Sequence, residues 1–152
     1  MESVRIRACT PKDIDAVIGL ERLWEQEDIA YGDFNPMQPE VYVAILERFP
    51  AYFLVAESDR QLVGYIHASV QCAKSVEVIP EQEPYVTIED IYVRPDARNQ
   101  DIGGKLLERV FEVARAAGIR RFIVGTKSKE TDKILRFYRS HGFTPWSIQF
   151  FK

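Results

Sequence analysis

Two adjacent glycines stand at the start of a helical pattern, within the stretch VRPDARNQDIGGKLL. Inside a helix, Gly103 and Gly104 would each cost roughly 1 kcal/mol relative to alanine. A helix N-terminus carries unpaired N–H groups and a partial positive charge, and glycine leaves that backbone open to an anion. Arg98 and Lys105 add positive charge on either side. The spacing therefore predicts an anion site; the alternative is a tight turn that needs glycine only for its dihedral angles.

The composition limits the partners and the location of the protein. A net charge of −3 argues against nucleic acid and is compatible with a cationic substrate. No apolar run approaches the roughly 20 residues that span a bilayer, so no membrane partner is expected. Two cysteines are too few for a disulfide framework, and no leader pattern opens the chain, which predicts a cytoplasmic protein. The histidines and cysteines are widely separated, so no metal is expected.

The elements that must position these residues form one mixed α/β domain over residues 1–152. Strands are predicted at 3–9, 51–58, 62–71, 85–93, 119–126 and 146–152, and helices at 10–28, 40–49, 104–118 and 130–142. The polar connection 59–61 predicts a hairpin, and Gly118 and Gly142 are expected to end helices. Thr10 and Pro11 are typical of a helix start.

The stretch around the two glycines resembles motif A of the GNAT superfamily of acyl-CoA N-acyltransferases. In that motif a strand ends in Val-x-Pro and is followed by Arg or Gln, two variable residues, Gly, a variable residue, and Gly or Ala. Residues 98–103 occupy those six places. ILRFYRSHGF, residues 134–143, resembles a later family motif, and VRIRACTPKDIDAV resembles the first strand and helix. The likeness covers nearly the whole chain.

The resemblance implies a fold and a co-substrate. The fold is a mixed, mostly antiparallel central sheet flanked by helices, and the co-substrate is acetyl-CoA, with no metal. Backbone amides of residues 98–104, called the motif loop below, would hold the pyrophosphate. The preceding strand, which splays from its neighbour in the family, would hold the pantetheine arm. The residues implied are Ile91, Tyr92, Val93, Arg98, Asn99, Gln100, Asp101, Ile102, Gly103, Gly104 and Lys105. Thr131 stands where many members have an asparagine that contacts pantetheine.

Asp101 departs from the motif, because it occupies the place of the first glycine. A carboxylate about 5 Å from a phosphate would cost up to ~3 kcal/mol at an effective dielectric constant of ~20. Aspartate tolerates left-handed backbone and caps helix starts. We therefore expect Asp101 to keep the turn and to point its side chain at solvent.

Acetyl transfer to an amine requires loss of a proton from nitrogen and protonation of the leaving thiolate. Tyr138 matches the family tyrosine that protonates the thiolate; the alternative is a core aromatic. IEDIYV resembles the same strand in polyamine-type members, where the glutamate acts as a base through water. Glu89 is therefore the first candidate base and Asp90 the second, and strand alternation predicts that they lie on opposite faces. Otherwise they cap the strand or pair with an arginine.

Two irregular loops, residues 31–39 and 74–84, are expected to supply the acceptor site. The substrate-binding candidates are Tyr31, Asp33, Phe34 and Glu83. Acidic and aromatic side chains together suit a small cationic amine. The alternative is a solvated loop face.

The resemblance leads to one functional hypothesis and two alternatives. The hypothesis is an acetyl-CoA-dependent N-acetyltransferase that acts on the primary amine of a small cationic molecule. The alternatives are acetylation of protein N-termini or lysines, and a non-catalytic CoA-binding sensor. The apolar residues of 146–152 would form an exposed edge strand, so we expect a homodimer that covers it.

Overall fold

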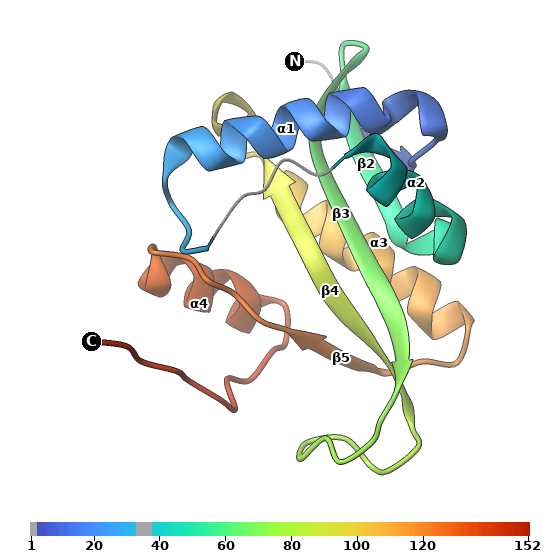
Figure 1. Ribbon diagram of the computed structural model, residues 1–152, viewed down its shortest axis with the longest axis vertical. Helices are drawn as coiled ribbons and strands as arrows, with labels where there is room; N and C mark the ends of the chain where they lie inside the picture. The colour runs from blue at the N-terminus through green and yellow to red at the C-terminus, as the bar shows by residue number, and fades with distance from the viewer. Residues whose placement is uncertain (1–2, 33–37) are drawn as a thin grey trace.

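A five-stranded sheet forms the centre of the molecule in the computed structural model, which describes residues 3–32 and 38–152 (Figure 1). The strands follow the chain in the order β1-β2-β3-β4-β5. They are β1 Arg5–Ala8, β2 Phe53–Ser58, β3 Gln61–Cys72, β4 Pro84–Val93 and β5 Arg121–Val124. The first four pair antiparallel and β4 pairs with β5 in parallel, which confirms the mixed, mostly antiparallel sheet. The candidate residues Asp33 and Phe34 lie outside the described residues.

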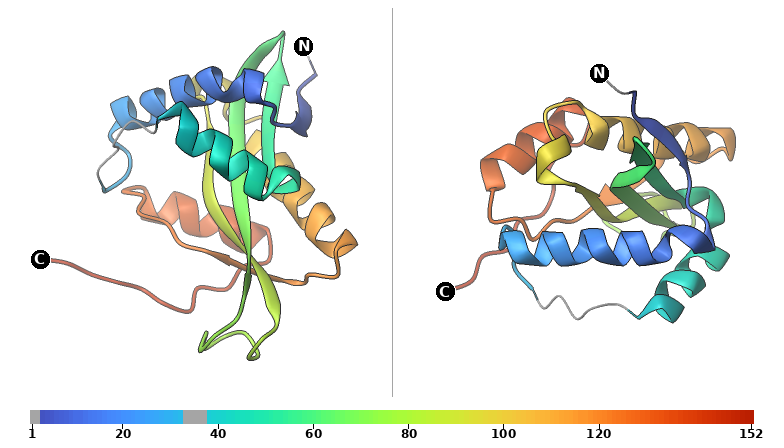
Figure 2. Two further views of the ribbon diagram at one scale, coloured as in Figure 1. Left: turned by 45° about the vertical axis from the view of Figure 1, so that its right-hand side comes forward. Right: turned by 90° about the horizontal axis from the view of Figure 1, so that it is seen from above.

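Helices cover both faces of this sheet (Figure 2). They are α1 Ile14–Glu27, α2 Pro39–Arg48, α3 Ile102–Ala116 and α4 Thr131–Ser140, with short 3-10 turns at Pro11–Asp13, Pro50–Tyr52 and Pro95–Ala97. Side chains of α1 and α2 pack in one buried cluster, and those of α3 and α4 pack in another on the opposite face. We call these the α1 face and the α3 face. None of the helices in the described ranges has the length and apolar character to cross a membrane.

Local sequence signals account for most element boundaries. Asp59 and Arg60 both have left-handed backbone, so the β2–β3 hairpin turns in two residues, as a type I′ turn requires. Gly118 and Gly142 have φ of 79° and 90° directly after α3 and α4, which confirms them as helix ends. Predicted and observed boundaries of these helices differ by about two residues at the other end, as is usual for helix termini.

An ion pair at the start of α1 joins the N-terminal strand to the helix. Arg7 donates two hydrogen bonds, of 2.8 and 2.9 Å, to the carboxylate of Asp13, and a third of 3.1 Å to Glu57 on β2. The Thr10 amide also donates to Asp13, at 2.8 Å. The hydrogen bonds from Arg7 lower the pKa of Asp13 to about 2, against the opposing effect of burial. The carboxylate therefore stays ionised well below neutral pH.

The predicted last strand, residues 146–152, is wrong. These residues have no regular secondary structure, and the C-terminal segment runs outward from the sheet (Figure 1). A strand requires a hydrogen-bonding neighbour, and none of the described strands pairs with this segment. The apolar side chains of the segment are consequently exposed: Trp146 by 48%, Ile148 by 69%, Phe150 by 91% and Phe151 by 81%.

Candidate active site

A β-bulge in the middle of β4 sets the direction of the two candidate bases. His67 on β3 pairs with Asp90, but the next residue of β3 pairs with Ile88, so Glu89 is an extra residue in the ladder. Ile88 and Ile91 both pack on the α3 face, although they are three positions apart. Both carboxylates therefore lie on the α1 face, and the predicted placement on opposite faces is wrong, because the bulge breaks the alternation.

Cross-strand hydrogen bonds from β3 hold both carboxylates of this bulge. Ser69 Oγ donates to Glu89 Oε1 at 2.7 Å, in an exposed position. His67 Nε2 lies 2.8 Å from Asp90 Oδ2, and its side chain is only 6% exposed, whereas that of Asp90 is 28% exposed. A histidine on an apolar strand is usually only satisfied in place, so sequence reasoning assigned His67 no role, and nothing in the pattern marked Ser69.

Beyond the bulge, β4 separates from β5. Their parallel pairing runs from Tyr85 with Arg121 to Ile88 with Val124 and ends there. The second half of β4, which contains Ile91, Tyr92 and Val93, extends past the end of β5 and past this ladder. The splay that the resemblance implied is therefore present. Backbone groups on this side are available to an extended molecule, as at any unpaired strand edge.

The loop between β4 and α3 contains two left-handed residues, Asn99 with φ of 67° and Asp101 with φ of 58°. Asp101 is the N-cap residue of α3, which confirms that it keeps the turn without a glycine. The 15-residue helix α3 therefore begins at the end of this loop, where its first amides have no partner within the helix. Gln100 lies between the two left-handed residues.

The carboxylate of Asp101 lies over the first turn of α3. A Cβ on Gly104 would come within 2.2 Å of Asp101 Oδ1 and within 3.0 Å of His141 Cε1. Asp101 is exposed, but its Oδ1 folds back onto the helix start and does not extend into solvent as expected. A side chain at position 104 would therefore require the Asp101 carboxylate to move aside. A Cβ on Gly103 would meet only ordinary contacts with Phe137, at 3.5 Å, so sterics within the chain do not require that glycine.

The side chain of Arg98 is engaged by α1. Its guanidinium donates two 2.7 Å hydrogen bonds to Glu27 and a 3.0 Å bond to the carbonyl of Val93. Tyr92 also donates to Glu27, at 2.5 Å, and Trp24 stacks on the Tyr92 ring at 5.2 Å. Burial acts to raise the pKa of Glu27, but the hydrogen bonds from Arg98 and Tyr92 outweigh it and lower the pKa. Arg98 therefore anchors the loop, and of the two expected cations only exposed Lys105 remains unengaged.

Tyr138 lies on α4 against the α3 face of the sheet. Its ring makes edge contacts with Phe137 at 5.1 Å and with Phe143 at 5.5 Å. Burial, with a smaller effect from the charge of Asp90, raises its pKa to about 12. The phenol therefore keeps its proton at neutral pH. The structure places Tyr138 on the α3 face and Asp90 on the α1 face, and none of the contacts between described residues joins the two side chains.

The two acceptor candidates that the structure describes, Tyr31 and Glu83, do not come together. Tyr31 is exposed after α1, where its amide donates to the carbonyl of Lys127 at 2.8 Å and its ring lies below the Lys129 ammonium at 5.2 Å. Glu83 precedes β4, at the end opposite the motif loop, and accepts a 2.6 Å hydrogen bond from Arg121. Figure 1 shows the β3–β4 loop and the end of α1 at separate places. Thr131 is exposed at the first residue of α4.

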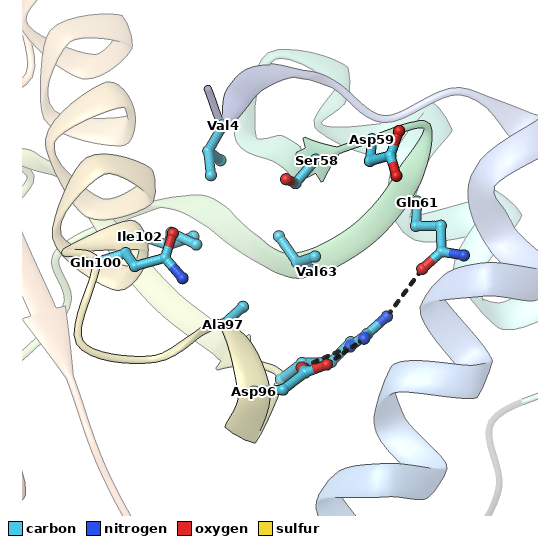
Figure 3. A pocket seen from close by; sticks show the side chains of 10 residues that line it. Val4, Ser58, Asp59, Gln61, Val63, Asp96, Ala97, Gln100 and Ile102 are labelled. Atoms are coloured by element: carbon cyan, nitrogen blue, oxygen red, sulfur yellow. Dashed lines mark hydrogen bonds and ion pairs between the residues drawn. The ribbon is translucent and has the colours of Figure 1, made fainter. Parts of the chain in front are cut away.

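A hollow lies between the β2–β3 turn and the start of α3, bordered by residues of the β4–α3 connection (Figure 3). Gln100 and Ile102 line it, but none of the candidate catalytic residues does. Its arginine, Arg94, is already paired, with hydrogen bonds of 2.5 and 3.0 Å to Asp96 and a 3.5 Å bond to Gln61. We therefore assign the hollow no part in the chemistry.

A mixed sheet whose β4 extends past the end of β5, with a helix that begins behind a left-handed loop, is the arrangement that the resemblance to acyl-CoA N-acyltransferases implied. Residues 20–143 match the model of the acetyltransferase (GNAT) family, and the chain belongs to that family. It is 30% identical over 131 residues to an IAA acetyltransferase of Azospirillum brasilense, covering 85% of this chain and 77% of that protein.

Solved structures share the fold. An aminoglycoside N-acetyltransferase in complex with CoA superposes with a TM-score of 0.74 at 20% identity, covering 100% of this chain and 95% of that one. A predicted acetyltransferase from Clostridium acetobutylicum with acetyl-CoA gives 0.74 at 16% identity, covering 99% and 96%. A metagenomic aminoglycoside acetyltransferase in complex with sisomicin gives 0.71 at 23% identity, covering 98% and 95%.

Neutralising Asp101 is expected to strengthen acetyl-CoA binding. Asp101→Asn keeps the size and the left-handed tolerance of the side chain but removes a negative charge from the helix start that faces the anion site. Because solvent screens part of the repulsion, we expect the Kd measured by calorimetry to fall roughly three- to tenfold at low salt and less at high salt. Glu112→Gln, on the exposed surface of α3, is the charge-matched control. An unchanged Kd would show that the Asp101 carboxylate turns away from the ligand.

Proposed function

We propose that the protein transfers the acetyl group of acetyl-CoA to the primary amine of a small cationic molecule. The observation that carries the proposal is the β4 bulge, which places Glu89 and Asp90 together on one face at the point where β4 extends past the end of β5. The two carboxylates suit removal of a proton from an ammonium, and the protonated phenol suits a leaving thiolate. One structural relative, the metagenomic aminoglycoside acetyltransferase, was solved with sisomicin, and aminoglycosides are cationic amines.

The residues present fit acetyl-CoA, which supplies an activated thioester. The amides at the start of α3 would bind the pyrophosphate, because the first N–H groups of a helix have no partner within the helix. The unpaired edge of β4, at Ile91 to Val93, would hold the pantetheine arm, and a backbone N–H of this edge would stabilise negative charge on the carbonyl oxygen. Thr131 at the start of α4 completes the proposed binding surface.

Two proton transfers are proposed: a carboxylate of β4 accepts a proton from the amine, and the phenol of α4 donates one to the thiolate. Glu89, held by Ser69, accepts the proton of the amine directly or through water; Asp90, held by His67, is the alternative base. Tyr138 donates its proton to the departing sulfur, a role that its raised pKa permits because the phenol stays protonated below about pH 12. Tyr31 is proposed to contact the acceptor, together with Asp33 and Phe34, while Glu83 is the weakest candidate because Arg121 neutralises it.

A thiol-release assay tests the activity. Wild-type protein with acetyl-CoA is mixed in turn with an aminoglycoside, a polyamine, free lysine and a peptide with an open N-terminus. We expect CoA release with one or more of the small cationic amines. Release only with the peptide would favour protein acetylation, and acetyl-CoA binding by calorimetry with no release for any amine would favour a sensor.

Substitutions at the bulge and on α4 are expected to respond differently to pH. Glu89→Gln should lower kcat by roughly 10²–10⁴-fold near neutral pH and recover part of the loss as pH rises, because more of the amine then arrives neutral. Tyr138→Phe removes only the hydroxyl, so its loss should persist at every pH below about 12. The measurement is kcat across pH with acetyl-CoA affinity as the control.

Asp90→Asn in the same assay identifies the base. It keeps the hydrogen bond to His67 but loses the negative charge. A small effect beside a large loss in Glu89→Gln assigns the base to Glu89, and the reverse assigns it to Asp90. Normal rates at low pH in both variants, or full recovery of Tyr138→Phe at high pH, would contradict the proposed roles.

We also propose a homodimer in the cytoplasm. The C-terminal segment exposes four large apolar side chains, and β5 is an end strand of the described sheet, so a second copy would cover both. Both cysteines are free, and Cys72 is exposed, which fits a reducing compartment.

Light scattering of the wild-type protein at micromolar concentration should give the mass of a dimer. Phe150→Asp should yield a monomer, whereas Val78→Asp, an exposed apolar control elsewhere, should not; a monomeric wild type would contradict the proposal.

A further inference from the structure

His67 occupies the point on β3 where the bulge of β4 begins. His67 pairs with Asp90 and the next residue, Ala68, pairs with Ile88. Glu89 therefore lies between two paired residues of β4 and has no pairing partner on β3. The link from His67 Nε2 to Asp90 Oδ2, at 2.8 Å, crosses the ladder at this irregularity. Because an ionised carboxylate only accepts hydrogen bonds, the histidine is the donor.

An aromatic layer fixes the histidine ring. The centroids of Phe53, Tyr65 and Tyr42 lie 5.4, 6.5 and 6.5 Å from the centroid of His67, and the Tyr65 ring is nearly parallel to it. His67 is 5% exposed, so its ring has little freedom to turn. The Nε2–H group of a ring held in this way points in one direction, toward Asp90. The imidazole therefore fixes the carboxylate.

The other titratable groups around His67 do not compete for this bond. Tyr42 of α2 donates its hydroxyl to buried Glu21 of α1, and burial raises the pKa values of both. Burial raises the pKa of Tyr65 well above its ordinary value, with smaller contributions from the charge of Asp90 and from the neighbouring hydroxyl of Tyr42. From the remaining elements, Glu89 of β4 is held by Ser69, and Tyr138 of α4 couples to Asp90 by charge alone.

We propose that His67 is a positioning residue of the transfer reaction, which acts through Asp90 to hold the β4 bulge and so directs both bulge carboxylates at the acceptor nitrogen. The proposal rests on the proposed function and adds a residue to it. His67 touches neither the reacting atoms nor the motif loop. Its effect on rate should therefore pass entirely through Asp90, whichever of the two carboxylates is the base.

Three variants separate positioning from packing. His67→Leu removes the donor and should lower kcat roughly 10–100-fold, the scale expected when a reacting group is misplaced by about 1 Å, with the KM for acetyl-CoA unchanged. His67→Gln restores an N–H donor and should recover part of the loss. Tyr65→Phe tests the packing, because it keeps the buried ring beside His67 and removes only the hydroxyl, so its loss of kcat should be far smaller than that of His67→Leu.

A double-mutant cycle tests the path of the effect. If His67 acts only through Asp90, then His67→Leu should have no further effect in an Asp90→Ala background. Circular dichroism of each variant confirms folding. Additive losses, a Gln variant as slow as the Leu variant, or an equal loss in Tyr65→Phe would overturn the proposal.

Nitrogen-15 NMR of labelled histidine reads the contact without turnover. In wild type the His67 Nε2–H proton should exchange slowly with water, and in Asp90→Ala the exchange should become fast. If wild type acetylates no amine, the proposed function fails while this spectrum still reports on the contact. If it turns over normally but the spectrum shows no such proton, the positioning proposal fails by itself.

Discussion

The extra residue in β4 is the constraint on which the rest of the site depends. Side chains alternate along a strand, so inserting one residue without a bulge would move every later side chain to the opposite face. The bulge at Glu89 absorbs the insertion: Ile88, Ile91 and Val93 all remain on the α3 face, and Tyr92 remains on the α1 face. A strand that is otherwise buried thereby presents two adjacent carboxylates on one side.

The same strand carries the constraint onward to the motif loop. Tyr92 points to the α1 face because the bulge keeps the register, and there it meets Glu27 together with Arg98. Arg98 also binds the carbonyl of Val93, so the loop is tied both to the end of β4 and to the end of α1. The proposed acyl-binding strand and the anion-binding loop are in this way two parts of one rigid connection.

The sequence predicted what local chemistry determines. The hairpin at 59–61, the helix ends at Gly118 and Gly142, and the left-handed turn at Asp101 follow from backbone preferences of the residues present. The family motifs added the splay of β4 and the sheet type. The local turns need only neighbours in the chain, whereas the splay and the sheet type depend on strand pairing and came from the family resemblance; the structure confirms both kinds of feature.

The predictions that the structure contradicts concern features set by contacts between residues far apart in the sequence. The bulge depends on how β3 pairs with β4, so no local pattern placed Glu89 and Asp90 on one face. Arg98 was expected to remain an available cation, but its partner Glu27 lies 71 positions earlier. The strand at 146–152 had the right alternation but no neighbouring strand, and His67 gained significance only from the carboxylate across the ladder.

The ion pair between Arg98 and Glu27 also orders the assembly of the domain. Contacts between residues so far apart form slowly, because the intervening chain must first lose its freedom. Synthesis proceeds from the N-terminus, so α1 leaves the ribosome well before the motif loop does. The acceptor of the pair is thus already present when the arginine emerges. The arginine therefore meets a carboxylate that is already part of the chain, whereas α4, with Thr131 and Tyr138, is synthesised only after the loop.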